Sequence, residues 1–304
     1  MKAFITGGAG FIGSHLAERL AARGDEVTIY DNLSTGKKEY MPSNTRNIFF
    51  IEGDIIDTDK LSEAMRNKDI VFHLAAKPSV NQSEGSHTYI EQNIIGTESV
   101  LLAMKRANVK NIAFASTQVV YGEHSGPVSE SSRTMPISYY GMSKLAGEAL
   151  ISSYCHDGYM RAWIFRLANI VGRRGHGVLR DFIKKLRERN DTFEILGNGN
   201  QRKSYLLVDE CIAAMLLILE KSSNPVNIFN VGSADTIDVK TIVNIVTSEL
   251  GLKPKLLFTG ARQGWPGDLV ELTLDTKKIN DLGWHSKYTQ EETISTALRQ
   301  MLKD

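Results

Sequence analysis

A tyrosine and a lysine four positions apart, Tyr140 and Lys144, have the types and spacing that most directly suggest catalysis. The surrounding segment SYYGMSKLAGEALISSY has helical character, so both side chains are expected on one helix face. A free tyrosine has a pKa of about 10, but a neighbouring ammonium group and a cofactor cation would favour its phenolate. Tyr140 then becomes a candidate general base. The alternative, two unrelated surface residues, is the better explanation when such a pair stands alone.

Two hydroxyl residues, Ser116 and Thr117, directly follow a predicted strand over residues 111–115. Ligands of doubly wound sheets bind at the carboxyl ends of the strands, so these hydroxyls are expected in the same site as Tyr140. A hydroxyl there can donate a hydrogen bond to the oxygen that Tyr140 deprotonates. The alternative is that both hydroxyls only cap a turn or a helix.

A glycine loop lies close to the start of the sequence, with Gly7, Gly10 and Gly13 in the segment TGGAGFIGSH. It follows a predicted strand, Lys2–Thr6, and begins a predicted helix over residues 11–23, which is the context of a dinucleotide site. Gly7 permits a tight turn, Gly10 lets the backbone approach a pyrophosphate, and Gly13 lets the helix pack closely on the sheet. The N-terminus of the helix then attracts the anion.

Asp31 stands at the end of the second predicted strand, residues 26–30. A carboxylate there can accept both hydroxyls of an adenosine ribose and repels a 2′-phosphate, so it favours NAD over NADP. No Lys or Arg follows directly, because the next residues are Asn32, Leu33, Ser34, Thr35 and Gly36. Asp54 comes after the third predicted strand, where binding of an adenine amine and capping of a loop explain it comparably well.

Short β-rich segments alternate with helical patterns through the first half of the chain. The further predicted strands are residues 47–51, 70–74, 111–115 and 160–167, and the helices are residues 58–66, 89–107 and Tyr139–Cys155. The strands show little polar and apolar alternation, as expected when both faces of a sheet are buried. Repeated βα units predict an α/β fold with a Rossmann-type doubly wound parallel sheet.

The sequence pattern changes after Leu167, where glycines and charged residues become more frequent. We expect residues 1–167 to form the cofactor-binding domain and residues 168–304 to form mainly a smaller C-terminal α/β lobe that binds the substrate. A helix over 208–220 and a strand over 226–231 are also predicted, and residues 206–232 are expected to return to the main sheet. Two further helices are predicted near residues 238–250 and 289–302.

Composition argues against several classes of function. The 304 residues include 36 Lys and Arg against 35 Asp and Glu, so there is no basic excess for nucleic acid. Cys155 and Cys211 form no CxxC pair and the seven histidines show no metal-ligand spacing, so neither a disulfide framework nor a metal site is expected. No apolar stretch approaches a membrane span and no signal peptide is evident, so we expect a cytoplasmic protein without a membrane partner.

Taken in order, these motifs resemble the extended short-chain dehydrogenase/reductase family over essentially the whole chain. The segments that carry the resemblance are TGGAGFIGSH (6–15), DNLSTG (31–36), GD (53–54), HLAA (73–76), NIIGT (93–97), STQVVYG (116–122), YGMSK (140–144), RLANIVG (166–172), GNGNQRKSYLLVDE (197–210) and LDTKKINDLGW (274–284). The DNLSTG segment is especially similar to the NAD-dependent 4-epimerases of UDP-hexoses.

The resemblance implies a role for each motif residue. Tyr140 would be the base, Lys144 would hold the nicotinamide ribose of NAD and tune Tyr140, and Thr117 would bind the O4 atom of a sugar. The other residues implied for the NAD site are Gly7, Gly10, Phe11, Ile12, Gly13, Asp31, Asn32, Ser34, Thr35, Gly36, Asp54, Ile55, Leu74, Ala75, Ala76, Asn93, Ser116 and Ala168. Those implied for a nucleotide-sugar are Asn169, Val178, Leu196, Lys203, Tyr205, Arg262 and Asp268.

Two positions depart from the family pattern. Many relatives carry arginine where Lys203 stands, and a lysine binds a diphosphate as a point charge rather than as a fork. Relatives also place an arginine shortly before the glycine and aspartate of a late loop. That loop reads ARQGWPGD here, so Arg262 is the candidate, and either Arg262 or Lys203 could be the main diphosphate anchor.

The two residues after Thr117 bear on the type of reaction. Sibling 4,6-dehydratases usually carry acidic residues there, and sibling sugar-acid decarboxylases usually carry a glutamate at the second position. Gln118 and Val119 cannot act as carboxylate acids or bases, so the resemblance implies 4-epimerisation of a UDP-hexose such as UDP-glucose, through a transient 4-keto sugar.

Two alternatives remain open at this point. One is 4-epimerisation of another nucleotide-sugar, carrying an N-acetylated or uronic sugar or a dTDP nucleotide. The other is a catalytically silent, NAD-binding regulatory protein, which the intact Thr117, Tyr140 and Lys144 disfavour. The resemblance further implies a homodimer formed through residues 89–107 and Tyr139–Cys155.

Overall fold

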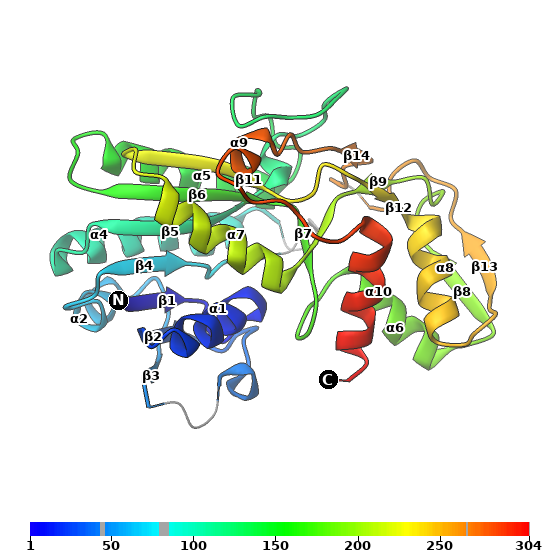
Figure 1. Ribbon diagram of the computed structural model, residues 1–304, viewed down its shortest axis with the longest axis horizontal. Helices are drawn as coiled ribbons and strands as arrows, with labels where there is room; N and C mark the ends of the chain where they lie inside the picture. The colour runs from blue at the N-terminus through cyan, green and yellow to red at the C-terminus, as the bar shows by residue number, and fades with distance from the viewer. Residues whose placement is uncertain (43–45, 79–84, 266, 304) are drawn as a thin grey trace.

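A seven-stranded parallel sheet forms the centre of the protein, with the strand order β11-β6-β5-β4-β1-β2-β3. The computed structural model describes residues 1–42, 46–78, 85–265 and 267–303. The strands of the sheet are β1 (Lys2–Thr6), β2 (Glu26–Asp31), β3 (Ile48–Glu52), β4 (Ile70–His73), β5 (Asn111–Thr117), β6 (Arg161–Leu167) and β11 (Val226–Val231). The predicted Rossmann-type α/β fold is confirmed, and β11 brings a late segment of the chain to the sheet edge (Figure 1).

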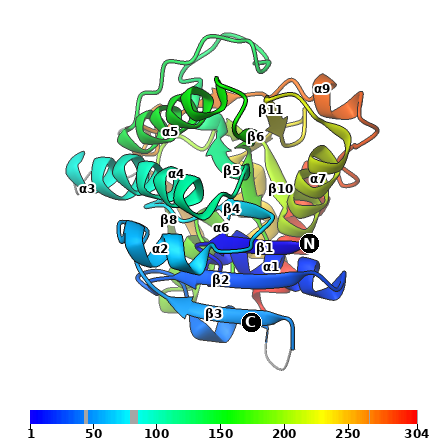
Figure 2. The same cartoon turned by 90° about the vertical axis from the view of Figure 1, so that its left-hand side faces the viewer.

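Helices cover both faces of this sheet (Figure 2). One face carries α2 (Thr58–Ala64), α4 (Gly96–Ala107) and α5 (Tyr139–Cys155), and the other carries α1 (Phe11–Ala22) and α7 (Val208–Lys221). Neighbouring residues of one strand therefore enter different apolar cores. Phe4 belongs to the core that includes Leu101 of α4, whereas Ile5 belongs to the core that includes Leu16 of α1. Burial on both faces explains why the strands show so little polar alternation.

The predicted bounds of these elements hold to within two residues, except in the segment predicted as one helix over residues 89–107. That segment begins with α3 (His87–Tyr89) and a π-helical stretch, η3 (Ile90–Ile95), before α4. Gly96 follows the π-helical stretch at a tight contact, where a Cβ would lie 2.5 Å from the Cδ1 atom of Ile55. A π-helical stretch leaves no clear mark in hydrophobic periodicity, so the sequence did not indicate it.

Apart from α7 and β11, most residues after Leu167 build a second lobe from small sheets and helices, on the right of Figure 1. Its strands are β7 (Asn169–Val171), β8 (Thr192–Ile195), β9 (Arg202–Lys203), β10 (Tyr205–Leu207), β12 (Ile237–Asp238), β13 (Lys255–Phe258) and β14 (Glu271–Leu272). Its helices are α6 (Val178–Glu188), α8 (Val239–Glu249) and α10 (Gln290–Met301), and the short α9 (Lys277–Asn280) packs on β11. A separate apolar core, which includes Phe182 and Val246, holds α6, α8 and α10 together.

The strand order reverses beside β1. The strands β2 and β3 extend the sheet on one side of β1, and β4, β5, β6 and β11 extend it on the other. The carboxyl ends of β1 and β4 therefore form the crevice where open α/β sheets bind their ligands. Among the described residues, no helix is long and apolar enough to cross a membrane.

Candidate active site

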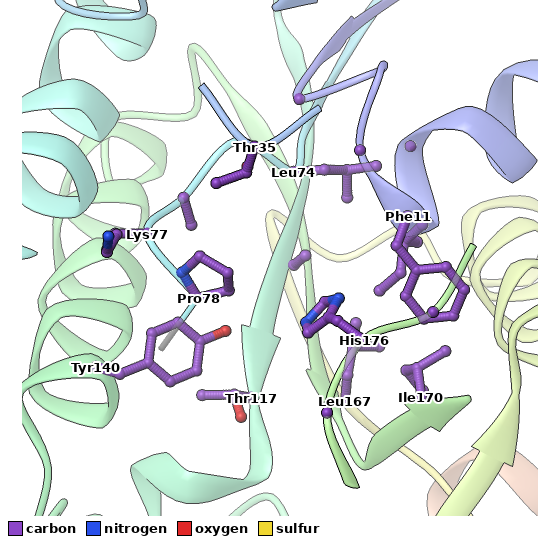
Figure 3. Close-up of a pocket in the computed structure, with 18 of the residues that line it drawn as sticks. Phe11, Thr35, Leu74, Lys77, Pro78, Thr117, Tyr140, Leu167, Ile170 and His176 are labelled. Atoms are coloured by element: carbon purple, nitrogen blue, oxygen red, sulfur yellow. The ribbon is translucent and has the colours of Figure 1, made fainter. Parts of the chain in front are cut away.

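A cavity of about 1150 Å³ lies at the carboxyl ends of the parallel strands and extends to the second lobe. Figure 3 shows Tyr140 on one side of it, Phe11 of α1 on the other, and His176 between them. The predicted residues that line it are Gly7, Gly10, Phe11, Ile12, Gly13, Asp31, Asn32, Ser34, Thr35, Ile55, Leu74, Ala75, Ala76, Ser116, Thr117, Tyr140, Lys144, Ala168, Asn169, Val178, Lys203, Tyr205 and Asp268.

The glycine loop leaves no room for side chains on its inner surface. A Cβ on Gly7 would lie 2.6 Å from the backbone nitrogen of Ala75, and one on Gly13 would lie 2.2 Å from the carbonyl oxygen of Gly7. Gly7 also has a φ of 71°, which favours glycine. Within the described part of the chain, no side chain caps α1 at Gly10, so backbone N–H groups are left to bind an anion. These features fit the pyrophosphate of a dinucleotide.

Asp31 ties the end of β2 to the glycine loop. Its carboxylate accepts hydrogen bonds from the N–H groups of Ala9 (3.0 Å) and Leu33 (2.8 Å). Burial raises the pKa of Asp31, and those two backbone donors oppose the rise. Because Asp31 also lines the cavity, it is placed to accept ribose hydroxyls. Lys37 also lines the cavity. The observation that Asp31 has no basic neighbour therefore applies only to the five residues that follow it directly.

Tyr140 and Lys144 lie one turn apart on α5. The helix begins after Ser138, whose hydroxyl accepts a hydrogen bond from the N–H of Gly141 (3.1 Å). Figure 3 shows the Tyr140 hydroxyl pointing into the cavity. The Lys144 side chain is buried, and its ammonium lies 4.6 Å from the centroid of the Phe114 ring on β5.

Burial shifts the pKa of both groups. It raises the pKa of the Tyr140 hydroxyl, and it lowers the pKa of Lys144 to about 7 although the Glu148 carboxylate opposes that shift. The protein alone therefore does not favour the Tyr140 phenolate, contrary to what the spacing of the pair suggested, because desolvation disfavours the charged form. A cation bound in the cavity, such as an oxidised nicotinamide ring, would lower the pKa of Tyr140.

The two predicted hydroxyls end β5 and both line the cavity. Thr117 also caps the short helix η4 (Gln118–Val120), because its Oγ1 accepts a backbone N–H of that helix at 3.4 Å. Ser116 donates a hydrogen bond to the Glu148 carboxylate, which forms a buried ion pair with Arg166 (2.7 Å). Thr117 thus combines capping with access to the cavity, whereas the Ser116 hydroxyl is committed to a buried network.

The wall from the second lobe carries a charged pair. Lys203 forms an ion pair with Asp268, and its ammonium lies 4.7 Å from the centroid of the Trp265 ring. Asp268 also accepts a hydrogen bond from the N–H of Gly264 (3.1 Å), which fixes the loop that carries Trp265. A lysine at this end of the cavity is suited to bind a diphosphate as a point charge.

Two residues predicted for the cofactor site lie behind its lining. Gly36 packs against Asp31, since a Cβ there would lie 2.9 Å from the Oδ1 atom of that carboxylate. Asp54 accepts hydrogen bonds from the side-chain amide of Asn32 (2.9 Å) and from the N–H of Ile56 (3.1 Å). Both residues shape loops around the cavity, so capping is the better explanation of Asp54.

Three more predicted residues lie outside the lining. The Asn93 amide donates to the carbonyl of Lys77 (3.1 Å) and to the hydroxyl of Ser143 (2.8 Å), so it joins the loop after β4 to α5. Leu196 is 44% exposed, and Arg262 is exposed on its loop. Of the two candidate diphosphate anchors, Lys203 faces the cavity and Arg262 does not.

Three other residues line the cavity although the sequence did not assign them to it; the basic segment that contains Arg174 was expected to form a solvated helix face. Trp265, Arg174 and His176 all line the cavity. The indole N–H of Trp265 is buried and has no hydrogen-bond partner in the described part of the chain. Its position three residues before Asp268, in the loop ARQGWPGD, was the available signal. Among the described residues, no group of three or more His, Cys, Asp or Glu side chains could hold a metal ion.

Comparison with known proteins places this site in a family. Residues 3–232 match the NAD dependent epimerase/dehydratase family. The chain belongs to that family. Its cofactor is therefore NAD, which agrees with the glycine loop and with Asp31. The chain is similar to the UDP-N-acetyl-alpha-D-glucosaminuronate decarboxylase of Bacillus cytotoxicus, with 33% identity over 98% of this chain and 97% of that relative.

Solved structures of epimerases are similar over the whole chain. A UDP-galactose 4-epimerase has 34% identity and a TM-score of 0.90, covering 100% of this chain and 99% of that one. A UDP-glucuronic acid 4-epimerase from Bacillus cereus, in complex with UDP-glucuronic acid and NAD, has 29% identity and a TM-score of 0.91 over the same shares. The names of these proteins span more than one sugar and more than one reaction.

Proposed function

We propose that this family member is a nucleotide-sugar 4-epimerase whose substrate is a UDP-hexose of the glucose and galactose pair. The position of the Tyr140 hydroxyl supports this most, because it points into a cavity shared by the glycine loop and Lys203. A base in that position can reach a sugar held between a dinucleotide and a diphosphate anchor. The names and the overall similarity of the epimerase structures also support the assignment.

The two lobes divide the binding work in this proposal. Residues 1–167, with residues 206–232 returning to the sheet, hold NAD through the glycine loop, Asp31 and the ends of β4 and β5. Residues 168–304 mainly hold the nucleotide-sugar, with Lys203 and Asp268 at its phosphate-binding wall. The strand β11 at the edge of the main sheet supports the return of the later segment.

The residues of the chain itself perform the proton chemistry. Bound NAD supplies a group that accepts a hydride from C4 of the sugar and later returns it. Tyr140 takes the proton from O4 as the alcohol is oxidised to the ketone, and it gives the proton back when the alcohol forms again. Thr117 donates a hydrogen bond to O4 and so stabilises the negative charge that develops there. Lys144 holds the nicotinamide ribose of NAD. When Lys144 is protonated, its ammonium is also a cation near Tyr140.

Inversion requires the 4-keto sugar to present its other face before the hydride returns. The protein can allow this by holding the nucleotide diphosphate firmly and the hexose loosely. Lys203 provides the firm contact, but it must first exchange its Asp268 partner for the phosphate. We therefore expect binding of UDP to loosen the Lys203 and Asp268 ion pair.

The residues after Thr117 support epimerisation over elimination or loss of carbon dioxide. Gln118 is buried with an oxygen that has no partner among the described residues, and Val119 lines the cavity beside it. Neither side chain can deliver or remove a proton as a carboxylate does. We expect no 4-keto-6-deoxy product from dTDP-glucose and no pentose from UDP-glucuronic acid.

A panel of nucleotide-sugars tests the proposal. UDP-glucose, UDP-N-acetylglucosamine, UDP-glucuronic acid and dTDP-glucose are incubated separately with the protein, and the sugar protons of the products are read by NMR. Fastest conversion of UDP-glucose to UDP-galactose supports the assignment. Faster inversion of another sugar would transfer the assignment to that substrate, and a protein that binds NAD but converts no sugar would indicate a regulatory role.

We also propose a homodimer that forms through η3, α4 and α5. These elements carry exposed apolar side chains, with Ile95 45%, Leu102 37% and Tyr139 36% exposed. Two copies of such a surface can cover one another around a two-fold axis. Sedimentation of the protein and of Leu102→Glu tests this, because the charged variant is expected to shift the protein towards monomer.

A further inference from the structure

A short segment of the second lobe crosses back to the cofactor side of the cavity. We call residues 172–177 the strap. It follows β7, begins at Gly172 and ends at Gly177, which precedes the first turn of α6. Within it, Arg174 has a φ of 61°, in the left-handed region that residues other than glycine adopt at a cost in free energy. Contacts elsewhere must hold Arg174 in this conformation.

The contacts that Arg174 makes with described residues outside the strap include three on the cofactor side. The Arg174 guanidinium donates hydrogen bonds to the Ser14 hydroxyl (3.0 Å) and to the Glu18 carboxylate (2.6 Å), both on the glycine-loop helix α1. It also lies 5.6 Å from the centroid of the Tyr40 ring, in the short 3₁₀ helix η1 (Lys38–Tyr40) that follows β2. The Arg174 side chain is only 10% exposed, so its ion pair with Glu18 is shielded from solvent.

The rest of the strap covers the glycine loop. A Cβ on Gly175 would lie 3.4 Å from the ring of Phe11, and the His176 ring stands edge-on to Phe11 with centroids 5.8 Å apart. Arg174, Gly175 and His176 all line the cavity together with Phe11 and Tyr40. The strap therefore forms a wall of the cofactor site that is built by the second lobe.

Arg173 provides an internal comparison. It bonds the other oxygen of the same Glu18 carboxylate at 2.8 Å, but its side chain is 42% exposed. Arg173 is also not among the residues that line the cavity. The two arginines thus share a partner and a charge, and they differ in whether they face the cofactor site.

We propose that Arg174 is a positioning residue for cofactor retention, and that its contacts with Glu18, Ser14 and Tyr40 keep the strap closed over bound NAD. A 4-epimerase needs the same cofactor molecule for both hydride transfers. If the reduced cofactor were released, the 4-keto sugar could not be reduced back to an alcohol. This reason for retention rests on the proposed function. The closure of the strap over NAD does not, because it concerns the resting protein.

The test measures release of NAD from the resting protein. The protein is loaded with labelled NAD, an excess of unlabelled NAD is added, and the label that remains bound is followed over time. Loss of charge-assisted hydrogen bonds at a shielded pair predicts that Arg174→Ala releases NAD about tenfold faster or more. Arg173→Ala removes a solvent-exposed pair and should change the rate by less than about threefold.

Two further variants keep the test decisive if Arg174→Ala folds poorly. Glu18→Ala removes the partner and should also speed release, whereas Arg174→Lys keeps the charge but loses the fork and should fall between the extremes. Thermal unfolding of the NAD-free proteins separates a merely structural role, which would lower the melting temperature without changing release. Unchanged release in Arg174→Ala and Glu18→Ala, or equal acceleration in Arg173→Ala, would overturn the proposal.

Turnover gives a second readout that depends on the epimerase assignment. During reaction with UDP-glucose, Arg174→Ala should lose activity progressively and regain it when NAD is added. If the unmodified protein epimerises no sugar, this arm fails together with the proposed function, while the release rates still test the strap. Stable activity of Arg174→Ala through many turnovers, without added NAD, would contradict the retention role.

Discussion

The two halves of the cavity, which we propose to hold the cofactor and the sugar, are built in different ways; we call them the cofactor half and the sugar half. The cofactor half comes largely from neighbouring segments, the glycine loop and the end of β2, and it relies on backbone N–H groups and on glycines without side chains. The sugar half draws Asn169, Lys203 and Asp268 from segments far apart in the sequence, and it relies on charged side chains. Local motifs therefore specify most of the cofactor half, to which the strap adds one wall, whereas long-range packing specifies the sugar half.

The largest effect on activity is expected at Tyr140, which lies where the two halves of the cavity meet; we call this position the seam. Tyr140→Phe removes one hydroxyl and keeps the ring, so we expect kcat to fall at least about a hundredfold. UDP and NAD should bind nearly as before, because their contacts lie in the two halves and not at the seam. Steady-state kinetics and binding titrations measure this. Tyr139→Phe is the control, since Tyr139 precedes it on α5 and is not among the cavity-lining residues.

A Tyr140→Phe variant with near-normal kcat would remove the proposed base from the mechanism. A large loss of NAD affinity in the same variant would show that the two halves are not separable in the way described.

The cofactor half should respond next most strongly, through Asp31. Asp31→Ala removes both the ribose acceptor and the bonds to the N–H groups of Ala9 and Leu33. Loss of bonds to a charged acceptor predicts NAD affinity at least about tenfold weaker and a narrower preference for NAD over NADP. Calorimetric titration with both cofactors measures this. Asp54→Ala is the matched control, because that carboxylate lies behind the lining, and equal effects of the two variants would refute the assignment.

The sugar half should show a smaller effect, at Trp265. Trp265→Leu removes the ring beside the Lys203 ammonium, together with an indole N–H that has no hydrogen-bond partner among the residues described. A cation–π contact in a partly buried site predicts UDP affinity about fivefold weaker. Titration with UDP checks this, with Arg262→Ala as the control that should bind UDP normally. The opposite order, with Arg262→Ala the weaker binder, would restore Arg262 as the anchor and would contradict the position of its loop.

A different kind of effect, on stability and not on binding or turnover, concerns the cofactor side. His73 is buried between Thr6 (2.8 Å) and Thr97 (3.0 Å), and burial lowers its pKa to about 3 from 6.5. Between these two pKa values His73 is protonated in the unfolded chain but not in the folded one, so the protein loses stability as the pH falls from about 6.5 towards 3. A difference of one bound proton changes the free energy of unfolding by ~1.4 kcal/mol per pH unit.

We expect His73→Gln to remove this pH dependence of the free energy of unfolding. Urea denaturation at a series of pH values measures the slope. His285→Gln is the control, because His285 is exposed and lies in the later part of the chain. An unchanged slope in His73→Gln would show that His73 does not carry the acid sensitivity.

The same contrast explains which features could be predicted. The glycine loop, Asp31, Thr117, Tyr140 and Lys144 sit on elements whose residues are continuous in sequence, and all of them line the cavity. Ligands at the ends of parallel strands could be expected because strand order fixes that crevice. The repeated βα units predicted a doubly wound parallel sheet, and the structure confirms it.

The remaining residues depend on contacts that local sequence does not record. The loop ARQGWPGD offers Arg262 and Trp265, and the choice between them is made by the bond from Gly264 to Asp268 and by the packing of Trp265 on Lys203. Asn93 was predicted to line the cofactor site, but η3 instead directs its amide to Lys77 and Ser143. The strap likewise joins segments about 160 positions apart, so its role emerged only from the folded chain.

Return of the same hydride tests the central claim most directly. UDP-glucose carrying deuterium at C4 is incubated with the protein in ordinary water, and the product is examined by NMR and mass spectrometry. Because NAD stays bound and returns the hydride that it accepted, the account predicts UDP-galactose with the deuterium kept at C4 and no need for added NADH. Product that has lost the deuterium to solvent, or no UDP-galactose from a protein that binds NAD and UDP-glucose, would contradict it.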